Sequence, residues 1–134
     1  MNVLVDTPIW SYALRSDNQR YNAHVQALTF LIRDHRALII GPIRQEILSG
    51  YSDIRAFMRL KEKLSAFDNT PVVDVDYEAA AQLCNACRRQ GVQGSHTDFL
   101  ICAVAKRLDV AIFTTDNDFI AYDRILSLNL YQTK

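Results

Sequence analysis

The sequence has no excess of charge of either sign: its 134 residues include 15 basic and 15 acidic side chains. Binding to nucleic acid through overall positive charge is therefore excluded, and any such binding needs a local basic surface. The longest uninterrupted apolar run is Phe99 to Ala105, far short of the roughly 20 residues that span a bilayer. No basic segment followed by a long apolar stretch opens the chain, so we expect neither a signal peptide nor a membrane span.

Cysteine is scarce, and the motifs of several common enzyme classes are missing. Three cysteines are an odd number for a disulfide framework, which favours a reduced, cytoplasmic setting. Cys84 and Cys87 have C-x-x-C spacing, but they fall inside a predicted helix and no second pair completes a zinc site, so we interpret them as packing residues. Neither a G-x-G-x-x-G sequence nor a P-loop is present, which disfavours nucleotide binding.

The apolar pattern alternates between short runs and helical periodicity along the whole chain, with no internal repeat or linker. We therefore predict a single domain over residues 1–134. Alternating strands and helices are typical of parallel sheets with helices on both faces. The predicted class is α/β, a three-layer α/β/α sandwich around a mostly parallel sheet of about five strands. We expect strands over residues 3–5, 38–40, 71–75 and 110–114, a final edge strand over 125–131, helices over 8–14, 22–34, 42–49, 53–67, 76–91 and 95–108, and a polar connection over 15–20.

The first predicted strand ends abruptly at a carboxylate. Val3, Leu4 and Val5 form an apolar run of the kind that is buried on both faces. Thr7 and Pro8 then supply an N-cap and a first-turn proline, so a helix is expected to begin at once. Asp6 is left at the carboxyl end of a buried strand, which is where open α/β sheets bind their ligands.

Three further acids are expected at the same edge of the sheet. Glu46 lies one turn into the helix after the second strand, Asp98 lies in the first turn of a helix that is apolar nearly all round, and Asp116 follows the strand over 110–114. Asp118 is a possible fifth. Carboxylates gathered in one pocket repel one another unless a cation lies among them or some stay protonated. Oxygen ligands without a Cys or His set favour a hard ion such as Mg²⁺ or Mn²⁺.

Each acid also has a purely structural interpretation. Asp6 and Asp116 can cap the helices that follow them, and Asp98 has the spacing of a capping-box acid with Ser95. Glu46 can be a solvated helix residue. Two observations favour the site: Asp6 and Asp116 interrupt strongly apolar sequence, and Asp98 opens a helix too apolar to lie on the surface.

Taken together, the acids and their neighbours resemble the PIN-domain family, and most closely the small VapC-type toxins of prokaryotic toxin–antitoxin pairs. The resemblance runs from residue 2 to about residue 131. It is carried by Val5-Asp6-Thr7, by Glu46 with Leu48 and Gly50, by the segment from Thr97 to Ala105, and by Thr114-Thr115-Asp116-Asn117-Asp118-Phe119.

This resemblance implies a Mg²⁺- or Mn²⁺-dependent endoribonuclease in which a metal-activated water hydrolyses the phosphodiester, leaving 5′-phosphate and 3′-hydroxyl ends. The family's metal-site acids fall on Asp6, Glu46, Asp98 and Asp116, and an accessory acid that varies in the family falls on Asp118. Thr7 and Thr115 lie beside them, where a hydroxyl can hold a water or a phosphate oxygen. The sequence departs from the family in the bulky Phe99 after the third acid and in His96, which is not part of the pattern.

An acidic pocket repels RNA, so a basic rim has to bring the backbone in. The candidate RNA contacts are Arg44, Arg55, Arg59, Arg88 and Arg89, although each of them can equally be part of an ordinary solvated helix face. The resemblance further implies a small cognate antitoxin as partner, and a homodimer.

Two other classes of function stay open. A non-catalytic PIN scaffold that binds RNA or a partner protein is the stronger alternative, although the complete set of acids argues against it. A receiver-type phosphoacceptor domain has a similar size and fold. It requires two adjacent acids after the first strand, where this sequence has only Asp6.

Overall fold

A computed structural model describes residues 1–15 and 19–133 of the chain. Its central strand, β1 (Val3–Val5), is buried along its whole length and pairs on both sides. It runs parallel to β2 (Ala37–Leu38) and to β3 (Ala111–Phe113), which gives the order β2-β1-β3. Val5 is paired in register with Phe113. Both strands therefore end at the same edge of the sheet, and the residues that follow them enter the same space.

Two single bridges extend the sheet beyond these three strands. Ile39 bridges Asn69 on one side, and Ile112 bridges Leu130 on the other, both in the parallel sense. The described residues thus form three strands flanked by two extended segments. This arrangement confirms the predicted α/β sandwich and its parallel sheet, with edges that are much shorter than expected.

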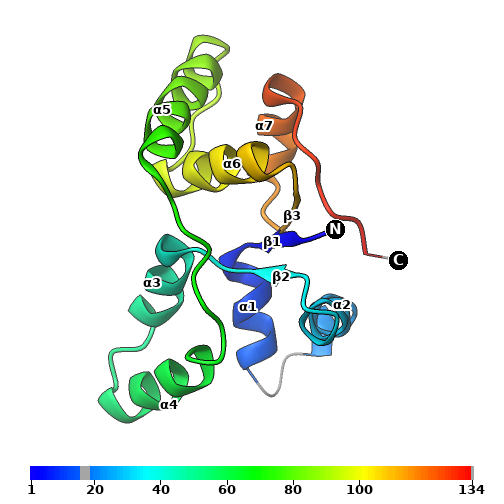
Figure 1. Ribbon diagram of the computed structural model, residues 1–134, viewed down its shortest axis with the longest axis vertical. Coiled ribbons are helices and arrows are strands. Elements are labelled where there is room, and N and C mark those ends of the chain that lie inside the picture. Colours follow the sequence, from blue (N-terminus) through cyan, green and yellow to red (C-terminus); the bar gives the residue numbers. More distant parts are fainter. Residues whose placement is uncertain (16–18, 134) are drawn as a thin grey trace.

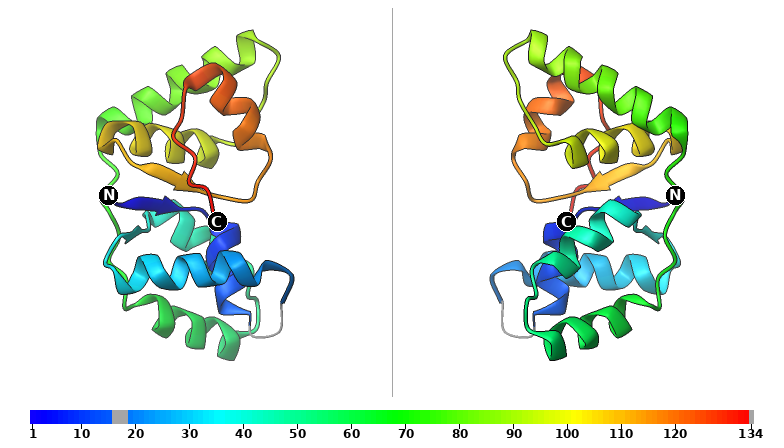
Figure 2. Two further views of the ribbon diagram at one scale, coloured as in Figure 1. Left: turned by 90° about the vertical axis from the view of Figure 1, so that its right-hand side faces the viewer. Right: turned by 90° about the vertical axis from the view of Figure 1, so that its left-hand side faces the viewer.

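The helices form two layers, one on each face of the sheet (Figure 2). The first four helices lie together on one side, and the last three lie on the other (Figure 1). The buried core of the second layer is α6, whose residues from Phe99 to Ala105 are all buried, as its apolar sequence predicted. None of the helices in the described part of the chain has the length and apolar character needed to cross a membrane. The elements are α1 (Thr7–Leu14), a 3₁₀ turn (Gln19–Tyr21), α2 (Asn22–Arg33), α3 (Gly41–Ser49), α4 (Ile54–Leu64), α5 (Asp74–Arg89), α6 (His96–Leu108) and α7 (Asp118–Leu126).

The strand predicted over residues 71–75 is wrong. Its valines are largely exposed, at 40% for Val73 and 57% for Val75, and α5 begins at Asp74 within the predicted strand. Two features end the pairing early. Pro71 has no N–H to donate to a ladder, and Asp76 Oδ2 accepts the Val73 N–H at 2.9 Å, which caps the helix instead.

The final edge strand predicted over 125–131 is reduced to a single bridge, and its first two residues belong to a helix that was not predicted. Residues 118–126 form α7, which buries Phe119, Tyr122 and Leu126. These three residues have helical spacing, whereas the alternating leucines that follow them favoured the strand prediction. Only the contact of Leu130 with Ile112 remains of the strand. The polar connection predicted over 15–20 falls largely on residues 16–18, which lie outside the described residues.

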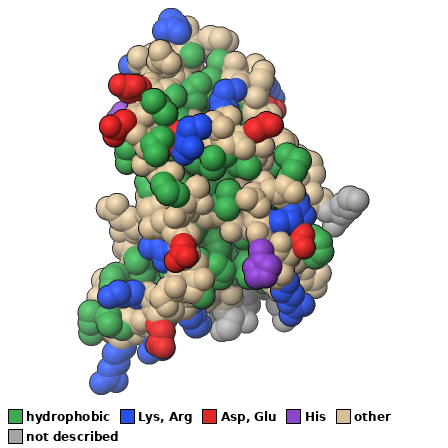
Figure 3. Space-filling view, in the orientation of Figure 1, with side chains coloured by type: hydrophobic (Ala, Val, Ile, Leu, Met, Phe, Trp, Pro, Cys, Tyr) green, Lys and Arg blue, Asp and Glu red, His purple; other side chains and the backbone are tan. Residues whose placement is uncertain are grey.

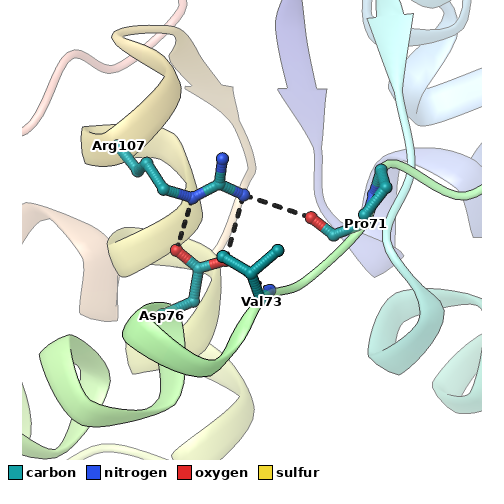
Figure 4. Close-up of polar contacts among 4 residues, drawn as sticks. All are labelled: Pro71, Val73, Asp76 and Arg107. Atoms are coloured by element: carbon teal, nitrogen blue, oxygen red, sulfur yellow. Dashed lines mark hydrogen bonds and ion pairs between the residues drawn. The ribbon is translucent and has the colours of Figure 1, made fainter.

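An ion pair between the partly exposed Arg107 and the buried Asp76 stabilises the crossover between the two layers (Figure 4). The side chain of Asp76 is 1% exposed, and Arg107 of α6 donates to both of its oxygens, at 2.7 and 3.0 Å. Arg107 also donates to the Pro71 carbonyl at 3.1 Å. The guanidinium lowers the pKa of Asp76, so the pair stays charged and joins the start of α5 to the end of α6.

The single tryptophan connects α1 to the central strand β1 through a hydrogen bond. Trp10 is 2% exposed, and its Nε1 donates to the Val5 carbonyl at 3.0 Å. Its ring also meets that of Phe67 edge-on, with 5.0 Å between the centroids. The last carbonyl of β1 is therefore satisfied by a side chain next to Asp6, so Trp10 does more than pack.

Candidate metal centre

Asp6 is the most deeply buried of the five acids, at 5% exposure. It is itself the N-cap of α1, since its Oδ1 accepts the Thr7 N–H at 2.8 Å, whereas the sequence suggested Thr7 for that position. Its Oδ2 accepts a 2.8 Å hydrogen bond from Thr114 Oγ1. The carboxylate is thus held from both sides at the mouth of the sheet. Asp6 therefore caps α1, as its structural interpretation predicted, and at the same time it lies among the acids of the candidate site.

Burial and neighbouring acids act on the ionisation of Asp6. Its enclosure raises its pKa to about 6, and the charges of Asp98 and Glu46 contribute to the increase. The hydrogen bonds from Thr114 and Thr7 work in the opposite direction. The charged form of Asp6 is thus disfavoured mainly by burial and to a smaller extent by like charge, and a bound cation would offset both effects.

Asp98 lies in the first turn of α6, half-buried, where Ser95 caps the helix. Its N–H donates to Ser95 Oγ at 3.0 Å, which is the N-cap half of the predicted capping box. Its carboxylate turns toward α7, where the Tyr122 hydroxyl donates to Oδ2 at 2.7 Å. Burial is the main cause of a raised pKa at Asp98, and the charges of Asp116 and Asp118 add to it. Burial and the bond to Asp98 also raise the pKa of Tyr122, which keeps its hydroxyl a donor.

Asp98, Asp116 and Asp118 form a compact group of oxygen ligands. Each offers one carboxylate oxygen, and these atoms all lie within 4.8 Å of one another. The loop that carries the last two is organised locally, since the Asp118 N–H donates to Asp116 Oδ1 at 2.9 Å. Thr114 Oγ1 accepts the Asp116 N–H at 3.0 Å and thereby links this loop to Asp6. The first turn of α7 and the end of β3 therefore place two acids opposite the start of α6.

Glu46 reaches the same group from α3. It is exposed, as Asp118 is, and its pKa is raised first by the burial it does have and then by the charges of Asp98 and Asp116. An acid that responds to both of these neighbours lies within electrostatic range of them. The four acids of the predicted set, from two helices and two strand ends, are thus linked electrostatically through Asp98 and Glu46.

The two threonines expected beside the acids differ in their partners. Thr7 Oγ1 is buried and has no hydrogen-bond partner among the described residues, although it lies close enough to Glu46 to lower the pKa of that carboxyl. Thr115 Oγ1 lies 2.8 Å from the hydroxyl of Tyr12. A buried hydroxyl without a partner is costly, and a ligand or an ordered water in the site would satisfy it. Thr7 is the stronger candidate for such a contact.

The donor set fits a hard divalent cation. It consists of carboxylates with one unpartnered hydroxyl beside them, and oxygen-only sites of this kind suit Mg²⁺ or Mn²⁺. The raised pKa values of Asp6, Glu46 and Asp98 show the like-charge pressure and burial that such an ion would counter. The residues present therefore fit a hard divalent cation.

The five candidate RNA contacts fall into two groups. Arg44 binds the protein itself: it donates to Asn69 Oδ1 at 2.9 Å, to the Leu64 carbonyl at 2.8 Å and to the Phe67 carbonyl. Its guanidinium thereby fastens α3 to the end of α4. The other four are exposed, with Arg55 and Arg59 on α4 and Arg88 and Arg89 on α5. Figure 3 shows basic side chains among hydrophobic ones at the lower-left end, which α4 forms.

The cysteines and His96, for which the sequence predicted no role in catalysis, have structural positions in the fold. Cys84, Cys87 and Cys102 are free and buried, and burial raises the pKa of the Cys87 thiol, the opposite of activation. His96 opens α6 as an exposed residue.

Two residues of the site were missed. Thr114 links Asp6 to Asp116 by hydrogen bonds. The pairing of Val5 with Phe113 places Thr114 beside Asp6, but this register is known only from the structure. Tyr122 was missed together with α7.

The chain belongs to the PIN-domain family, because the sequence profile of the PIN domain matches residues 3–125. This membership removes the support for a receiver-type domain. No relative is found among curated protein sequences.

The structure is also similar in fold to three solved structures. It matches FitAcB from Neisseria gonorrhoeae with a TM-score of 0.78 and 21% identity, over 97% of this chain and 96% of that one. VapBC2 from Rickettsia felis, solved with a DNA fragment from its promoter, gives 0.76 and 17% over the whole of both chains. DNA-bound VapBC from Salmonella typhimurium gives 0.75 and 14%, over 98% of this chain and 97% of the other.

Proposed function

We propose that the protein is a Mg²⁺- or Mn²⁺-dependent endoribonuclease with Asp6, Glu46, Asp98 and Asp116 as its catalytic acids and Asp118 as an accessory ligand. The observation that carries the proposal is the meeting of Asp98, Asp116 and Asp118 oxygens within 4.8 Å of one another in a PIN domain. When bound, a divalent ion supplies positive charge for the phosphodiester and lowers the pKa of the attacking water. Hydrolysis in line with the 3′ oxygen leaves 5′-phosphate and 3′-hydroxyl ends.

The chain's own residues account for the remaining tasks. Thr114 holds Asp6 and the Asp116 loop together, and Tyr122 holds Asp98. Thr7 offers an unpartnered hydroxyl to a water or a phosphate oxygen. Arg55 and Arg59 on α4, with Arg88 and Arg89 on α5, are exposed and attract the RNA backbone toward the acids.

The test compares the wild type with Asp6→Asn, and with Glu78→Gln as a matched control on the exposed face of α5. Sequencing of RNA 5′-phosphate ends after expression should show discrete new ends for the wild type and the control, and none for Asp6→Asn. The purified wild type should lose cleavage in EDTA and regain it with Mg²⁺ or Mn²⁺. Equal cleavage by Asp6→Asn would overturn the proposal and favour a scaffold whose RNA binding needs no ion.

We further propose that the protein is the toxin of a cytoplasmic toxin–antitoxin pair and forms a homodimer. The fold shared with FitAcB and VapBC chains supports a small antitoxin as partner. The dimer is supported by exposed apolar side chains at the start of α5, namely Val73, Val75 and Tyr77. Light scattering should give twice the chain mass for the wild type and the single mass for Val75→Glu. Growth arrest on expression, reversed by the gene encoded alongside, tests the toxin role.

A further inference from the structure

Tyr122 is an enclosed tyrosine whose only polar atom points at a candidate metal ligand. Its side chain lies in α7 at 0% exposure. The hydroxyl donates a 2.7 Å hydrogen bond to Asp98 Oδ2. Among the acids of the site, Asp98 is thus held by a side chain from a different element, across the gap between α6 and α7.

The position of this hydroxyl is fixed by its surroundings. The ring lies between two phenylalanines, with centroids 5.0 Å from Phe99 and 5.1 Å from Phe119. Its tip presses against the backbone of Gly94, where an added Cβ would lie 2.1 Å from the hydroxyl oxygen and 2.7 Å from Cζ. A side chain at position 94 and the observed Tyr122 cannot coexist. Glycine is therefore required here for space.

We infer that Tyr122 is a positioning residue, which fixes the Asp98 carboxylate in the orientation that a divalent cation needs between Asp98, Asp116 and Asp118. The inference rests on the proposed function. A carboxylate surrounded by other carboxylates is repelled by them and would rotate toward solvent without a donor. The hydrogen bond from an immobile ring keeps it turned inward, so cation binding does not have to order it. Outer partners of this kind change metal affinity by about 10–100-fold in metalloproteins.

The direct test is Tyr122→Phe, which keeps the ring and its two aromatic contacts and removes only the hydroxyl. Calorimetric titration of the purified protein with Mn²⁺ should show an affinity about 10-fold weaker than that of the wild type. Cleavage should require proportionally more Mn²⁺, while the rate at saturating Mn²⁺ changes much less. Tyr51→Phe is the matched control, because no hydrogen bond joins its hydroxyl to an acid in the described part of the chain. It should bind Mn²⁺ as the wild type does.

Gly94→Ala tests the same inference with the tyrosine left in place. The new methyl group displaces the hydroxyl from Asp98, so Mn²⁺ affinity should fall by a similar factor. In the Tyr122→Phe background the hydroxyl is already absent, and adding Gly94→Ala should lower the affinity little further. Such non-additivity is the signature of two residues that act through one contact. A purely structural role for Tyr122 would lower the melting temperature of the variants and leave their Mn²⁺ affinity unchanged.

Two outcomes separate this inference from the proposed function. Wild-type Mn²⁺ affinity in folded Tyr122→Phe or in Gly94→Ala, alongside lost binding in Asp98→Asn, would overturn the positioning role and leave the metal site intact. Wild-type Mn²⁺ affinity in Asp98→Asn would overturn the proposed metal site itself.

Discussion

Thr114 and Asp6 are joined across the two central strands by a 2.8 Å hydrogen bond from Oγ1 to Oδ2. The bond continues the register of β1 with β3 by one residue beyond Val5 and Phe113. Because the same Oγ1 accepts the Asp116 N–H, one hydroxyl sets the spacing of two predicted ligands that lie 110 positions apart in the sequence.

Thr114→Val should therefore weaken metal binding in a pH-dependent way. The donated bond lowers the pKa of Asp6, so its removal raises that pKa above about 6. Ionised Asp6 binds the cation, and the midpoint of Mn²⁺ affinity against pH should move upward. Calorimetry at pH 6 and pH 8 should show the larger loss at pH 6. Thr29→Val, which removes a hydroxyl bonded to the Val25 carbonyl in α2, is the control. An equal loss at both pH values would contradict the prediction.

Asp6→Asn should stabilise the metal-free protein at neutral pH while abolishing its stabilisation by metal. The folded-state pKa of Asp6 is raised from 3.8 to about 6, so between these values the folded protein holds a proton that the unfolded chain has lost. The free energy of unfolding consequently falls as pH rises through this interval and stays low above it. Two pKa units correspond to about 3 kcal/mol, the upper limit of the gain expected for the neutral amide.

Urea unfolding in EDTA at pH 4.5 and pH 7.5 measures this effect. The wild type should lose stability between the two pH values relative to Asp6→Asn, and Mn²⁺ should restore it only in the wild type. Parallel pH profiles for the two proteins would show that Asp6 ionises normally.

Arg107→Ala should destabilise the fold without changing metal affinity. It leaves the buried carboxylate of Asp76 with only the Val73 N–H as a donor. Because the Arg107 side chain is 33% exposed, solvent screens its charge, and the loss of stability at pH 7 should be smaller than that for a fully buried pair. Arg107 lowers the pKa of Asp76, so its contribution is present above pH 4 and is lost as Asp76 protonates below its ordinary pKa.

Chemical denaturation at pH 7 and pH 3 tests this pH dependence. The difference in free energy of unfolding between wild type and variant should be smaller at pH 3 than at pH 7. Arg124→Ala, an exposed arginine on α7, should be nearly silent.

Two double variants should bind RNA more weakly, and their RNA affinity should depend less on salt concentration. They are Arg55→Ala/Arg59→Ala and Arg88→Ala/Arg89→Ala. Each phosphate contact contributes a slope of about 0.7 in a plot of log affinity against log salt for single strands. A pair that contacts RNA should therefore reduce the slope by about 1.4. Filter binding with the Asp6→Asn protein, in which cleavage is blocked, measures this at several KCl concentrations. Arg33→Ala at the exposed end of α2 is the control. An unchanged slope would remove that pair from the RNA surface.

The acids were predictable from sequence because their positions depend on local pattern. Asp6 ends an apolar run, and Asp98 follows a serine cap at the head of an apolar helix, and both signals lie within a few residues of the acid. The α/β sandwich was predictable for the same reason, since short buried runs and helical periodicity alternate clearly along the chain.

The partners of the acids were not predictable, because they depend on pairing between distant segments. The role of Thr114 requires the register of two strands, and that of Tyr122 requires α7 to be packed on α6. The alternating leucines near residue 128 concealed α7, although Phe119, Tyr122 and Leu126 have helical spacing. Arg44 resembles a surface cation in sequence, and only the fold brings it to the carbonyls that end α4.

The hydrogen bond from Trp10 to the last carbonyl of β1 holds the indole in one fixed environment, so its fluorescence can report on the fold. It is the single tryptophan, so all indole fluorescence reports from one enclosed position next to Asp6. Unfolding exposes the indole to water, so red-shifted emission should report loss of the fold on the unlabelled protein.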